Sequence, residues 1–346
     1  MSMKRIVLII PYFGKLPSWI QLFLNSCSFN REVNFLFFTD DKTIMECNIP
    51  DNVAVEFISF QELRKMFVDK VGKLYLGHPY KLCEYKPLYG YVFQDYISGY
   101  EYWGHCDIDL IFGDIMFFLN KIDYRKYDRI FPLGHLSLYR NDEKNNKMFL
   151  RARKKDYRSV ADFSLVCSTT YPCHFDETGM TVIYKQEPDV NFFEDTFHLQ
   201  IYMHKLHIRT SEDTVPELVL FDNGDICLLR KEGGKIIRSK HIYMHFQNRK
   251  SMPSHFDVKD TGQQFLITHE GFVPFCSDRI DEYFEQYGRL DTEEENRNFV
   301  KEVEKARRKG VRQRLLREFG TNHIFAFYHI YRRIMNVIYL KKNGLF

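Results

Sequence analysis

The sequence lacks an apolar run long enough to cross a membrane. The best candidate, IFAFYHIYRRIMNVIYL near the C-terminus, is interrupted by His329, Arg332 and Arg333, whereas a spanning helix needs about 18 consecutive apolar residues. The apolar run IVLII near the N-terminus ends at Pro11 and is not followed by a small-residue cleavage site, so we predict no signal peptide. We therefore expect a protein that does not cross a membrane and is cytoplasmic.

Cysteine motifs are also missing. The chain contains eight cysteines but no C-x-x-C pair and no histidine cluster at zinc-like spacing. In a chain of 346 residues, scattered cysteines are typical of reduced, mostly buried thiols in a cytosolic protein. The pattern argues against a disulfide framework and against a structural zinc site.

A strong net charge is absent, but the charge is unevenly distributed. The formal net charge is +3, and residues 301–342 contain twelve Lys and Arg against three Glu. In this basic segment Arg alternates with Leu, Ile and Phe, which favours amphipathic helices over a nucleic-acid site. We expect no nucleic-acid partner. The helices would either attach peripherally to the inner face of the plasma membrane or pack on their own domain.

The N-terminal part has the pattern of a strand, a helix and a second strand. Residues 5–10 and 33–41 are apolar runs typical of buried strands. Residues 18–27 have helical spacing, with Ser18 as the expected N-cap. This βαβ unit predicts an α/β fold with a Rossmann-like beginning, in which ligands bind at the carboxyl ends of the strands.

Further elements follow along the chain. We expect a strand over residues 102–106, which would deliver Asp107 and Asp109 at its carboxyl end. The remaining expectations are a third strand over 53–60 with a helix after it, a helix over 80–97 with Pro87 near its first turn, a strand within 127–141, short strands over 181–185 and 221–246, a loop over 174–179, and helices beyond Asp281.

Three carboxylates interrupt the apolar stretch EYWGHCDIDLIFGDI: Asp107, Asp109 and Asp114. Buried carboxylates need a partner. Asp107 and Asp109 are two residues apart, which points both side chains to one side of an extended chain, and hard oxygen ligands suit Mg²⁺ or Mn²⁺. The alternative is that both are surface residues of an edge strand. We expect Asp114 to be a structural cap just beyond.

A strand that ends in D-x-D after an N-terminal βαβ unit resembles the GT-A glycosyltransferases, whose D-x-D holds a metal on the diphosphate of a nucleotide sugar. Four blocks, KLCEYKPLYG, WGHCDIDLIFGD, GHLSLYRN and HFDETG, are together similar to a family of bacterial polysaccharide-biosynthesis glycosyltransferases found with capsule and O-antigen genes. The similarity spans roughly residues 5–250. It implies a hexosyltransferase that moves a sugar from a nucleotide sugar, expected to be a UDP-sugar, to a surface glycan or lipid-linked glycan.

The resemblance also implies a metal site. Asp109 would be the principal ligand, and Asp107 would bridge the Mn²⁺ or Mg²⁺ and the nucleotide ribose. The segment IYMHFQNRK is similar to the downstream histidine segment of some GT-A enzymes, which makes His245 the third ligand, although the glycine and Lys-Pro of that segment are missing here. Arg249 and Lys250 would contact phosphate oxygens. The alternative for His245 is a hydrogen-bonded histidine at a strand end.

The donor and acceptor sites follow from the same resemblance. Lys86, next to Pro87, and Lys81 would face the diphosphate, or else lie on a solvated helix face. An inverting transfer needs a base, for which Asp176 is preferred, with Glu177 orienting or replacing it. Base and ribose contacts are expected from Pro11, Tyr12, Phe13, Thr39 and Asp40, and sugar or acceptor contacts from His135, Tyr139, Arg140 and Asn141.

Two other functions remain open. A D-x-D also occurs in the haloacid-dehalogenase phosphatases, where the first aspartate is the nucleophile. There the motif opens the fold, whereas here it lies past residue 100. The second alternative is a non-catalytic nucleotide- or carbohydrate-binding protein. We predict a GT-A catalytic domain over residues 1–275 and a helical basic extension over residues 276–346.

Overall fold

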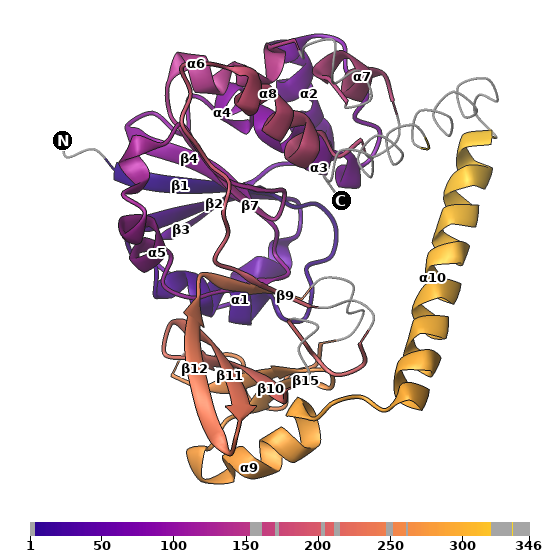
Figure 1. Cartoon of the computed structure of the whole chain (residues 1–346). Helices are drawn as coiled ribbons and strands as arrows, with labels where there is room; N and C mark the ends of the chain where they lie inside the picture. The colour runs from indigo at the N-terminus through magenta and orange to yellow at the C-terminus, as the bar shows by residue number, and fades with distance from the viewer. Residues whose placement is uncertain are drawn as a thin grey trace.

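A seven-stranded sheet with the strand order β3-β2-β1-β4-β7-β6-β8 forms the centre of the protein (Figure 1). The computed structural model describes residues 4–152, 161–169, 173–201, 205–210, 215–246, 252–260, 262–319 and 334. β3, β2, β1 and β4 run parallel, and β7 pairs antiparallel with β4. The strands are β1 Lys4–Pro11, β2 Val33–Thr39, β3 Val53–Phe57, β4 Tyr100–Cys106, β6 Arg129–Leu133, β7 Leu136–Arg140 and β8 Phe192–Phe193.

Helices cover both faces of this sheet, which buries its strands on both sides. In β1, Ile6, Leu8 and Ile10 pack against the helices of one face, and Val7 and Ile9 pack against those of the other. The first face carries α1 Ile20–Ser28 and α5 Ile115–Lys121; the second carries α2 Phe60–Val71, α3 Leu82–Tyr85, α4 Tyr89–Val92, α7 Phe163–Ser168 and α8 Met180–Gln186. The predicted α/β class is confirmed, and the parallel-rich sheet is consistent with a GT-A-like fold.

The start of α1 differs from the prediction. Its N-cap is Trp19 rather than Ser18, and no side chain caps this end of the helix. The start of α2 shows the usual chemistry instead, because Ser59 and Glu62 form a reciprocal capping box. The side chain of Trp19 is used elsewhere, in the site described below.

Three further local predictions are wrong. Residues 80–97 do not form one helix: α3 and α4 are separated by the short 3₁₀ turn Lys86–Leu88, which contains Pro87. Residues 181–185 belong to α8, because Val182, Ile183 and Tyr184 are buried in the core as a helix rather than as a strand. Residues 175–179 form a π-helical turn, Phe175–Gly179, rather than a loop.

A second, antiparallel sheet with the order β12-β11-β10-β14-β15 lies below the first in Figure 1. Residues 221–246 form short strands with turns at Gly224 and Gly233, as predicted. The strands of the second sheet are β10 Glu217–Asp222, β11 Asp225–Glu232, β12 Lys235–His241, β14 Phe265–Thr268 and β15 Gly271–Pro274. A small sheet, β5-β13-β9, contains β5 Leu110–Phe112, β9 Leu199–Gln200 and β13 Tyr243–His245.

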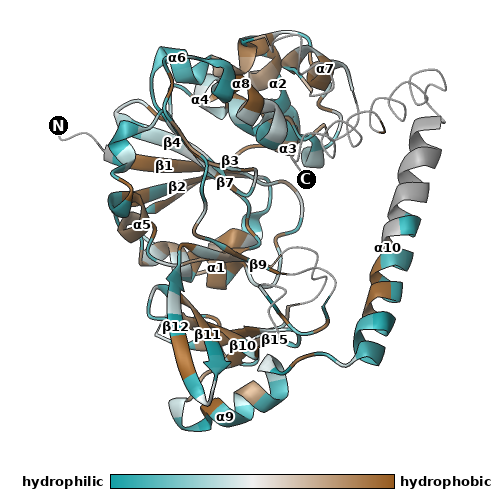
Figure 2. Cartoon of the chain, viewed as in Figure 1, coloured by the Kyte–Doolittle hydropathy of each residue, from teal (hydrophilic) through white to brown (hydrophobic). Residues whose placement is uncertain are grey.

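The described C-terminal part consists of helices. Tyr283, Phe284 and Tyr287, in and after α9 Ile280–Tyr283, pack against one face of the second sheet. The long helix α10 Glu293–Phe319 then runs apart from the body of the protein, and its first turns are mostly hydrophilic (Figures 1 and 2). α6 Glu143–Asn146 lies among the upper helices in Figure 1. Most of the predicted basic helices beyond α10 lie outside the described residues.

The structure bears on two expectations from the sequence, which concern membrane-spanning helices and disulfides. Within the part of the chain that the structure describes, no helix has both the length and the apolar character that a membrane span requires. All eight cysteines are free thiols: three are buried, four are half-buried and Cys276 is exposed.

Candidate active site

Asp107 and Asp109 lie in a tight turn between β4 and β5, rather than along an extended strand. The predicted strand over residues 102–106 is present as β4 and ends directly before them. Three hydrogen bonds from other elements fix the backbone of this turn: Asp107 N to His135 O at 3.1 Å, Trp19 Nε1 to Ile108 O at 3.3 Å, and Phe246 N to Asp109 O at 3.2 Å. The D-x-D is therefore held rigidly by residues distant in sequence.

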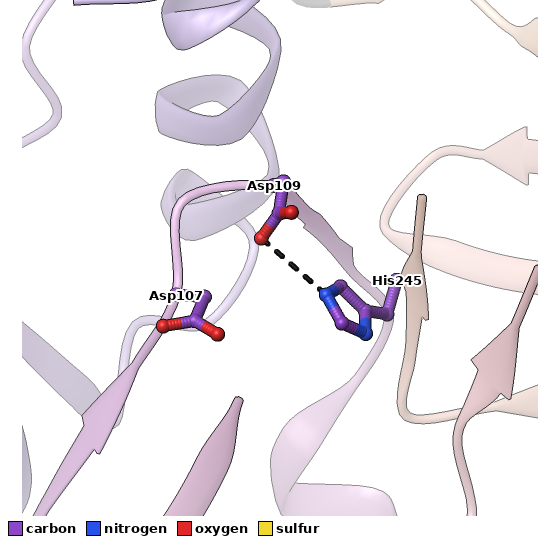
Figure 3. A group of neighbouring side chains, drawn as sticks. All are labelled: Asp107, Asp109 and His245. Atoms are coloured by element: carbon purple, nitrogen blue, oxygen red, sulfur yellow. Dashed lines mark ion pairs between the residues drawn. The ribbon is translucent and has the colours of Figure 1, made fainter. Parts of the chain in front are cut away.

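The small sheet brings His245 to this turn. β13 pairs antiparallel with β5, and its last residue, His245, lies opposite Leu110. The Nε2 atom of His245 is 3.5 Å from Oδ1 of Asp109. Figure 3 shows these two side chains pointing toward one another, with Asp107 beside them. One ligand atom from each of Asp107, Asp109 and His245 lies within 4.8 Å of the other two.

These three residues fit a divalent cation. Ligands about 2.1 Å from a Mg²⁺ ion are at most about 4.2 Å apart, so a small side-chain rotation would close the observed spacing. The His245 ring is buried, and its Nδ1 atom has no hydrogen-bond partner within the described residues. Two carboxylates and one imidazole are a common donor set for Mn²⁺ and related ions.

Lys86 is the direct partner of Asp107. Its Nζ atom is 2.5 Å from Oδ1 of Asp107 and also donates to Gly134 O at 2.8 Å. Burial opposes the charge on Lys86, but Asp107 and the neighbouring Cys83 and Asp176 outweigh it, so the pKa of Lys86 is raised well above its ordinary value. Lys86 is therefore a buried, permanently charged lysine rather than part of a solvated helix face.

Asp114 has the structural role expected of it. It is the N-cap of α5, and its Oδ1 atom accepts the N–H of Phe117 at 2.9 Å. Its side chain is thus used at the start of the helix and does not belong to the Asp107–Asp109–His245 group.

A cavity of about 910 Å³ opens over the turn, a size typical of sites for small molecules and cofactors. Five carboxylates line it against three lysines, Lys15, Lys81 and Lys86. Such a wall repels a diphosphate unless a cation also binds. The sequence-predicted residues among those lining it are Pro11, Tyr12, Phe13, Lys81, Lys86, Asp107, Asp109, His135, Asp176, Glu177 and His245.

Thr39, the last residue of β2, and Asp40 are not among the residues that line this cavity. Thr39 is buried, and its Oγ1 atom accepts the N–H of Asp41 at 3.1 Å. Asp40 accepts the N–H of Gly14 at 2.9 Å and so holds the loop that follows β1. In this structure Thr39 and Asp40 support the cavity wall rather than forming it.

The acidic pair lies across the cavity on the π-helical turn. A bulge in β6, with Phe131 at a φ of 68°, precedes the β6–β7 hairpin that carries Gly134. The N–H of Gly134 donates to Oε1 of Glu177 at 2.9 Å. A Cβ atom on Gly134 would lie 2.3 Å from Oδ2 of Asp176, so any other residue at this position would force the Asp176 side chain to move.

The two acids have opposite electrostatic environments. Burial raises the pKa of Asp176 from 3.8 to about 8, and Glu177, Glu84 and Asp107 add to the rise while Lys86 opposes it. Burial also acts on Glu177, but the His174 ring, whose Nδ1 atom is 3.8 Å from Oε2, and the hydrogen bond from Gly134 N–H outweigh it and lower the pKa of that carboxyl. Pairs with separated pKa values are typical of acid–base sites.

His135 belongs to a group of histidines that includes His245 and His198. Its ring centroid is 4.3 Å from that of His245 and 5.0 Å from that of His198, and its Nδ1 atom is 2.7 Å from Tyr243 Oη. Burial, followed by the neighbouring imidazoles, lowers the pKa of His135 well below its usual range. His135 is therefore a neutral ring that supports His245.

The other residues of GHLSLYRN are structural. Tyr139 is buried and stacks on Trp103 with ring centroids 4.4 Å apart. Arg140 donates to backbone carbonyls, including Tyr127 O at 3.1 Å. Asn141 donates to the backbone carbonyls of Ile97, before β4, and of Tyr100, the first residue of β4. None of these three is among the residues that line the cavity, and their contacts with sugar or acceptor stay predictions. Arg249 and Lys250 lie outside the described residues.

Trp19, Glu84 and Gly134 are among the residues of the site that sequence reasoning missed. Trp19 holds the D-x-D backbone, Gly134 makes space for the acids, and Glu84 is a buried carboxylate in the cavity wall. Glu84 lies in the segment KLCEYKPLYG two positions before Lys86, but nothing in a single sequence distinguishes it from a surface glutamate.

The chain was also compared with known proteins. The model of one protein family, described as "Family of unknown function (DUF6625)", matches residues 8–276. No curated protein matches the chain.

Among solved structures, mouse xyloside xylosyltransferase 1 in its apo form is 10% identical, with a TM-score of 0.37 over 72% of this chain and 99% of that chain. The glycosyltransferase GlyE of Streptococcus pneumoniae TIGR4 is 10% identical, with a TM-score of 0.27 over 56% of this chain and 45% of that chain. Similarity at this level establishes neither the activity nor the substrate of the protein.

Proposed function

The chain belongs to the family of unknown function DUF6625, and because that family assigns no activity, we propose from the site itself that the protein is a metal-dependent glycosyltransferase. It would transfer a sugar from a nucleotide diphosphate sugar, in the first instance a UDP-sugar, to a glycan acceptor. The observation that carries the proposal is a cavity lined both by Asp107, Asp109 and His245 and by the acidic pair of buried Asp176 and half-buried Glu177.

The place of the cavity in the fold supports a nucleotide donor. It lies at the carboxyl ends of β1 and β4, which are parallel neighbours in the sheet, and ligands of open α/β sheets bind at this edge. Pro11, Tyr12 and Phe13 follow β1 and offer an apolar wall for a base. Asp107 and Asp109 follow β4 and lie where a diphosphate would need a counter-ion.

Asp107, Asp109 and His245 would hold Mn²⁺ or Mg²⁺. When bound, the ion supplies positive charge that stabilises a departing diphosphate. The chain itself contributes the orientation of these ligands, because the backbone of the turn is bonded at three positions and His135 packs against His245. Lys86 holds the Asp107 carboxylate in place through their ion pair.

Asp176 is the base in this proposal. In its ionised form it accepts the proton of the acceptor hydroxyl while that oxygen bonds to the anomeric carbon, and the bond from this carbon to the diphosphate oxygen breaks, with the electron pair leaving on the nucleotide. A pKa of about 8 suits a base that works near neutral pH. Glu177, whose pKa is lowered, orients the pair through Gly134. Attack opposite the leaving group would invert the anomeric centre.

The acceptor is proposed from sequence. The four blocks that resemble polysaccharide-biosynthesis glycosyltransferases favour a bacterial surface glycan, either free or carried on a lipid. The basic C-terminal segment would suit attachment to an anionic membrane surface. The hexosyltransferase class and the division at residue 275 belong to the same proposal.

The two alternative functions predict different behaviour. In the phosphatase hypothesis Asp107 would be the nucleophile, but the motif follows β4 in the middle of the sheet, and Asp107 is one of three grouped ligands. A purely binding protein would have no need for a buried acid with a raised pKa, such as Asp176.

The experiment is a thermal-shift and calorimetry screen of nucleotides and nucleotide sugars, with and without Mn²⁺. We expect UDP to stabilise the wild-type protein only when Mn²⁺ is present. The variant Asp109→Ala should lose this response while remaining folded, because its half-exposed side chain contributes little packing.

Asp114→Ala is the matched control. It removes a carboxylate five residues away that caps α5 and takes no part in the metal group, so the response to UDP and Mn²⁺ should be retained. If Asp109→Ala bound UDP and Mn²⁺ as the wild type does, the metal site would be wrongly assigned.

A further inference from the structure

Glu84 is a buried carboxylate whose partners are backbone groups of the segment that carries the acidic pair. It lies in α3, and only 3% of its surface is exposed. Its Oε1 atom accepts the N–H groups of Cys173 at 2.7 Å and His174 at 3.0 Å, and its Oε2 atom accepts that of Phe175 at 3.4 Å. These three amides directly precede Asp176, about 90 residues away in sequence.

The π-helical turn needs such support. His174 has a φ of 55°, in the left-handed region that non-glycine residues seldom adopt. The turn Phe175–Gly179 begins immediately after this residue, and no side chain of its own caps it. The carboxylate of Glu84 accepts hydrogen bonds from three successive amides at the start of this turn. At the other side, Arg129 donates to Asp176 O at 3.2 Å.

The segment of residues 84–86 also contacts Asp107, one of the proposed metal ligands. Two positions after Glu84, Lys86 bonds to Oδ1 of Asp107 and to Gly134 O, while Gly134 N–H bonds to Glu177. Residues 84–86 therefore connect the π-helical turn that carries Asp176 and Glu177 to the turn that carries Asp107 and Asp109. The relative position of the two halves of the cavity depends on this connection.

We propose that Glu84 is a positioning residue, whose carboxylate sets the place of Asp176 and Glu177 relative to Asp107, Asp109 and His245 by binding the backbone amides of residues 173–175. The inference rests on the proposed function for its catalytic consequence. It assigns to the buried glutamate of α3 a part in the geometry of the reaction, although Glu84 does not touch the reacting atoms.

Glu84 also acts on Asp176 electrostatically, which gives a readout that a purely structural role would lack. The charged groups that act on Asp176 are Lys86, Glu177, Glu84 and Asp107. The negative charge of Glu84 contributes to the raised pKa of Asp176. Replacing it with a neutral side chain should therefore shift the titration of Asp176 to lower pH.

The test compares Glu84→Ala and Glu84→Gln in UDP-sugar turnover. We expect kcat to fall about 100-fold in Glu84→Ala, the effect of misplacing a catalytic group by about 1 Å, with the KM for the donor unchanged. Glu84→Gln should recover part of the loss, because its amide oxygen can still accept from Cys173 and His174. In both variants the acidic limb of the pH profile should move to lower pH.

Glu217→Gln is the matched control. Glu217 is also a buried glutamate that accepts a backbone amide, that of Thr210 at 3.0 Å, but it lies in the second sheet. Its replacement should lower stability without changing the KM or the pH profile. If the Glu84 variants retained wild-type kcat and an unshifted pH profile, the inference would be refuted.

A measurement without turnover separates this inference from the proposed function. The carboxyl of Asp176 can be titrated by ¹³C NMR of selectively labelled protein, with Asp176→Asn to assign the signal. A lower pKa in Glu84→Gln in a protein that turns over no nucleotide sugar would contradict the proposed function but keep the positioning role. An unchanged pKa in an active protein would contradict the positioning role alone.

Discussion

Gly134 allows the sharpest test of how closely the two halves of the cavity fit together. Its backbone bonds to Lys86 on one side and to Glu177 on the other. A Cβ atom at this position would lie 2.3 Å from Oδ2 of Asp176 and 3.0 Å from Oε1 of Glu177. Gly134→Ala therefore pushes directly on the proposed base without changing any charged residue.

The size of the effect follows from that distance. Real Cβ atoms essentially never approach another heavy atom within 3.0 Å, so Oδ2 of Asp176 must retreat by at least 0.7 Å from its 2.3 Å position. Displacing a catalytic group by about 1 Å costs about 100-fold in rate, which corresponds to about 2.7 kcal/mol in the activation barrier. The added methyl group should also cost about 1–3 kcal/mol of stability through overpacking.

The assay is steady-state release of UDP from a UDP-sugar in the presence of Mn²⁺. We expect kcat to fall about 100-fold in Gly134→Ala, while UDP and Mn²⁺ still bind, because Asp107, Asp109 and His245 do not touch the new methyl group. Gly262→Ala is the control, since its Cβ atom would meet nothing nearer than 3.6 Å. Wild-type turnover in Gly134→Ala would refute the assignment of the acidic pair.

Three further predictions concern single carboxylates. Asp114→Ala should cost about 1 kcal/mol in the free energy of unfolding, measured by urea denaturation, because α5 loses its cap. Asp291→Ala should cost about 3–5 kcal/mol in the same assay, since its buried carboxylate accepts two backbone amides and pairs with His207; unaltered stability would contradict this. Because the pKa of Asp176 in the folded protein, about 8, lies above its ordinary value of 3.8, the folded state binds the extra proton, and metal-free stability should decline as pH rises from about 4 to 8. Asp176→Asn should flatten this decline, and an unchanged slope would show that another group causes it.

The sequence was sufficient to predict the features that depend on local patterns. The apolar runs of β1, β2 and β4 have the length and composition of buried strands, and Asp107 and Asp109 follow the last of them. His245 was predicted from its resemblance to a known segment, and the structure places it beside Asp109. The strands and the two aspartates lie within short stretches of chain, where the apolar pattern carries the information.

The errors arose where tertiary contacts decide the local structure. TVIYK is rich in β-branched residues and has the composition of a strand, yet Val182 and Ile183 pack into the core from a helix. The turn after His174 depends on the carboxylate of Glu84, which no pattern near residue 175 reveals. Trp19 and Gly134 act through single contacts with distant residues. The propensity of a short segment to form a helix or a strand gives no information on its contacts with residues distant in sequence.

The most direct test of the central claim is UDP release from a set of UDP-sugars, with water or an added glycan as the acceptor, in wild type and Asp109→Ala with and without Mn²⁺. Release of UDP that requires both the metal and Asp109 is the result predicted here. No release from any nucleotide sugar, together with metal-dependent hydrolysis of a phosphomonoester, would contradict the glycosyltransferase assignment.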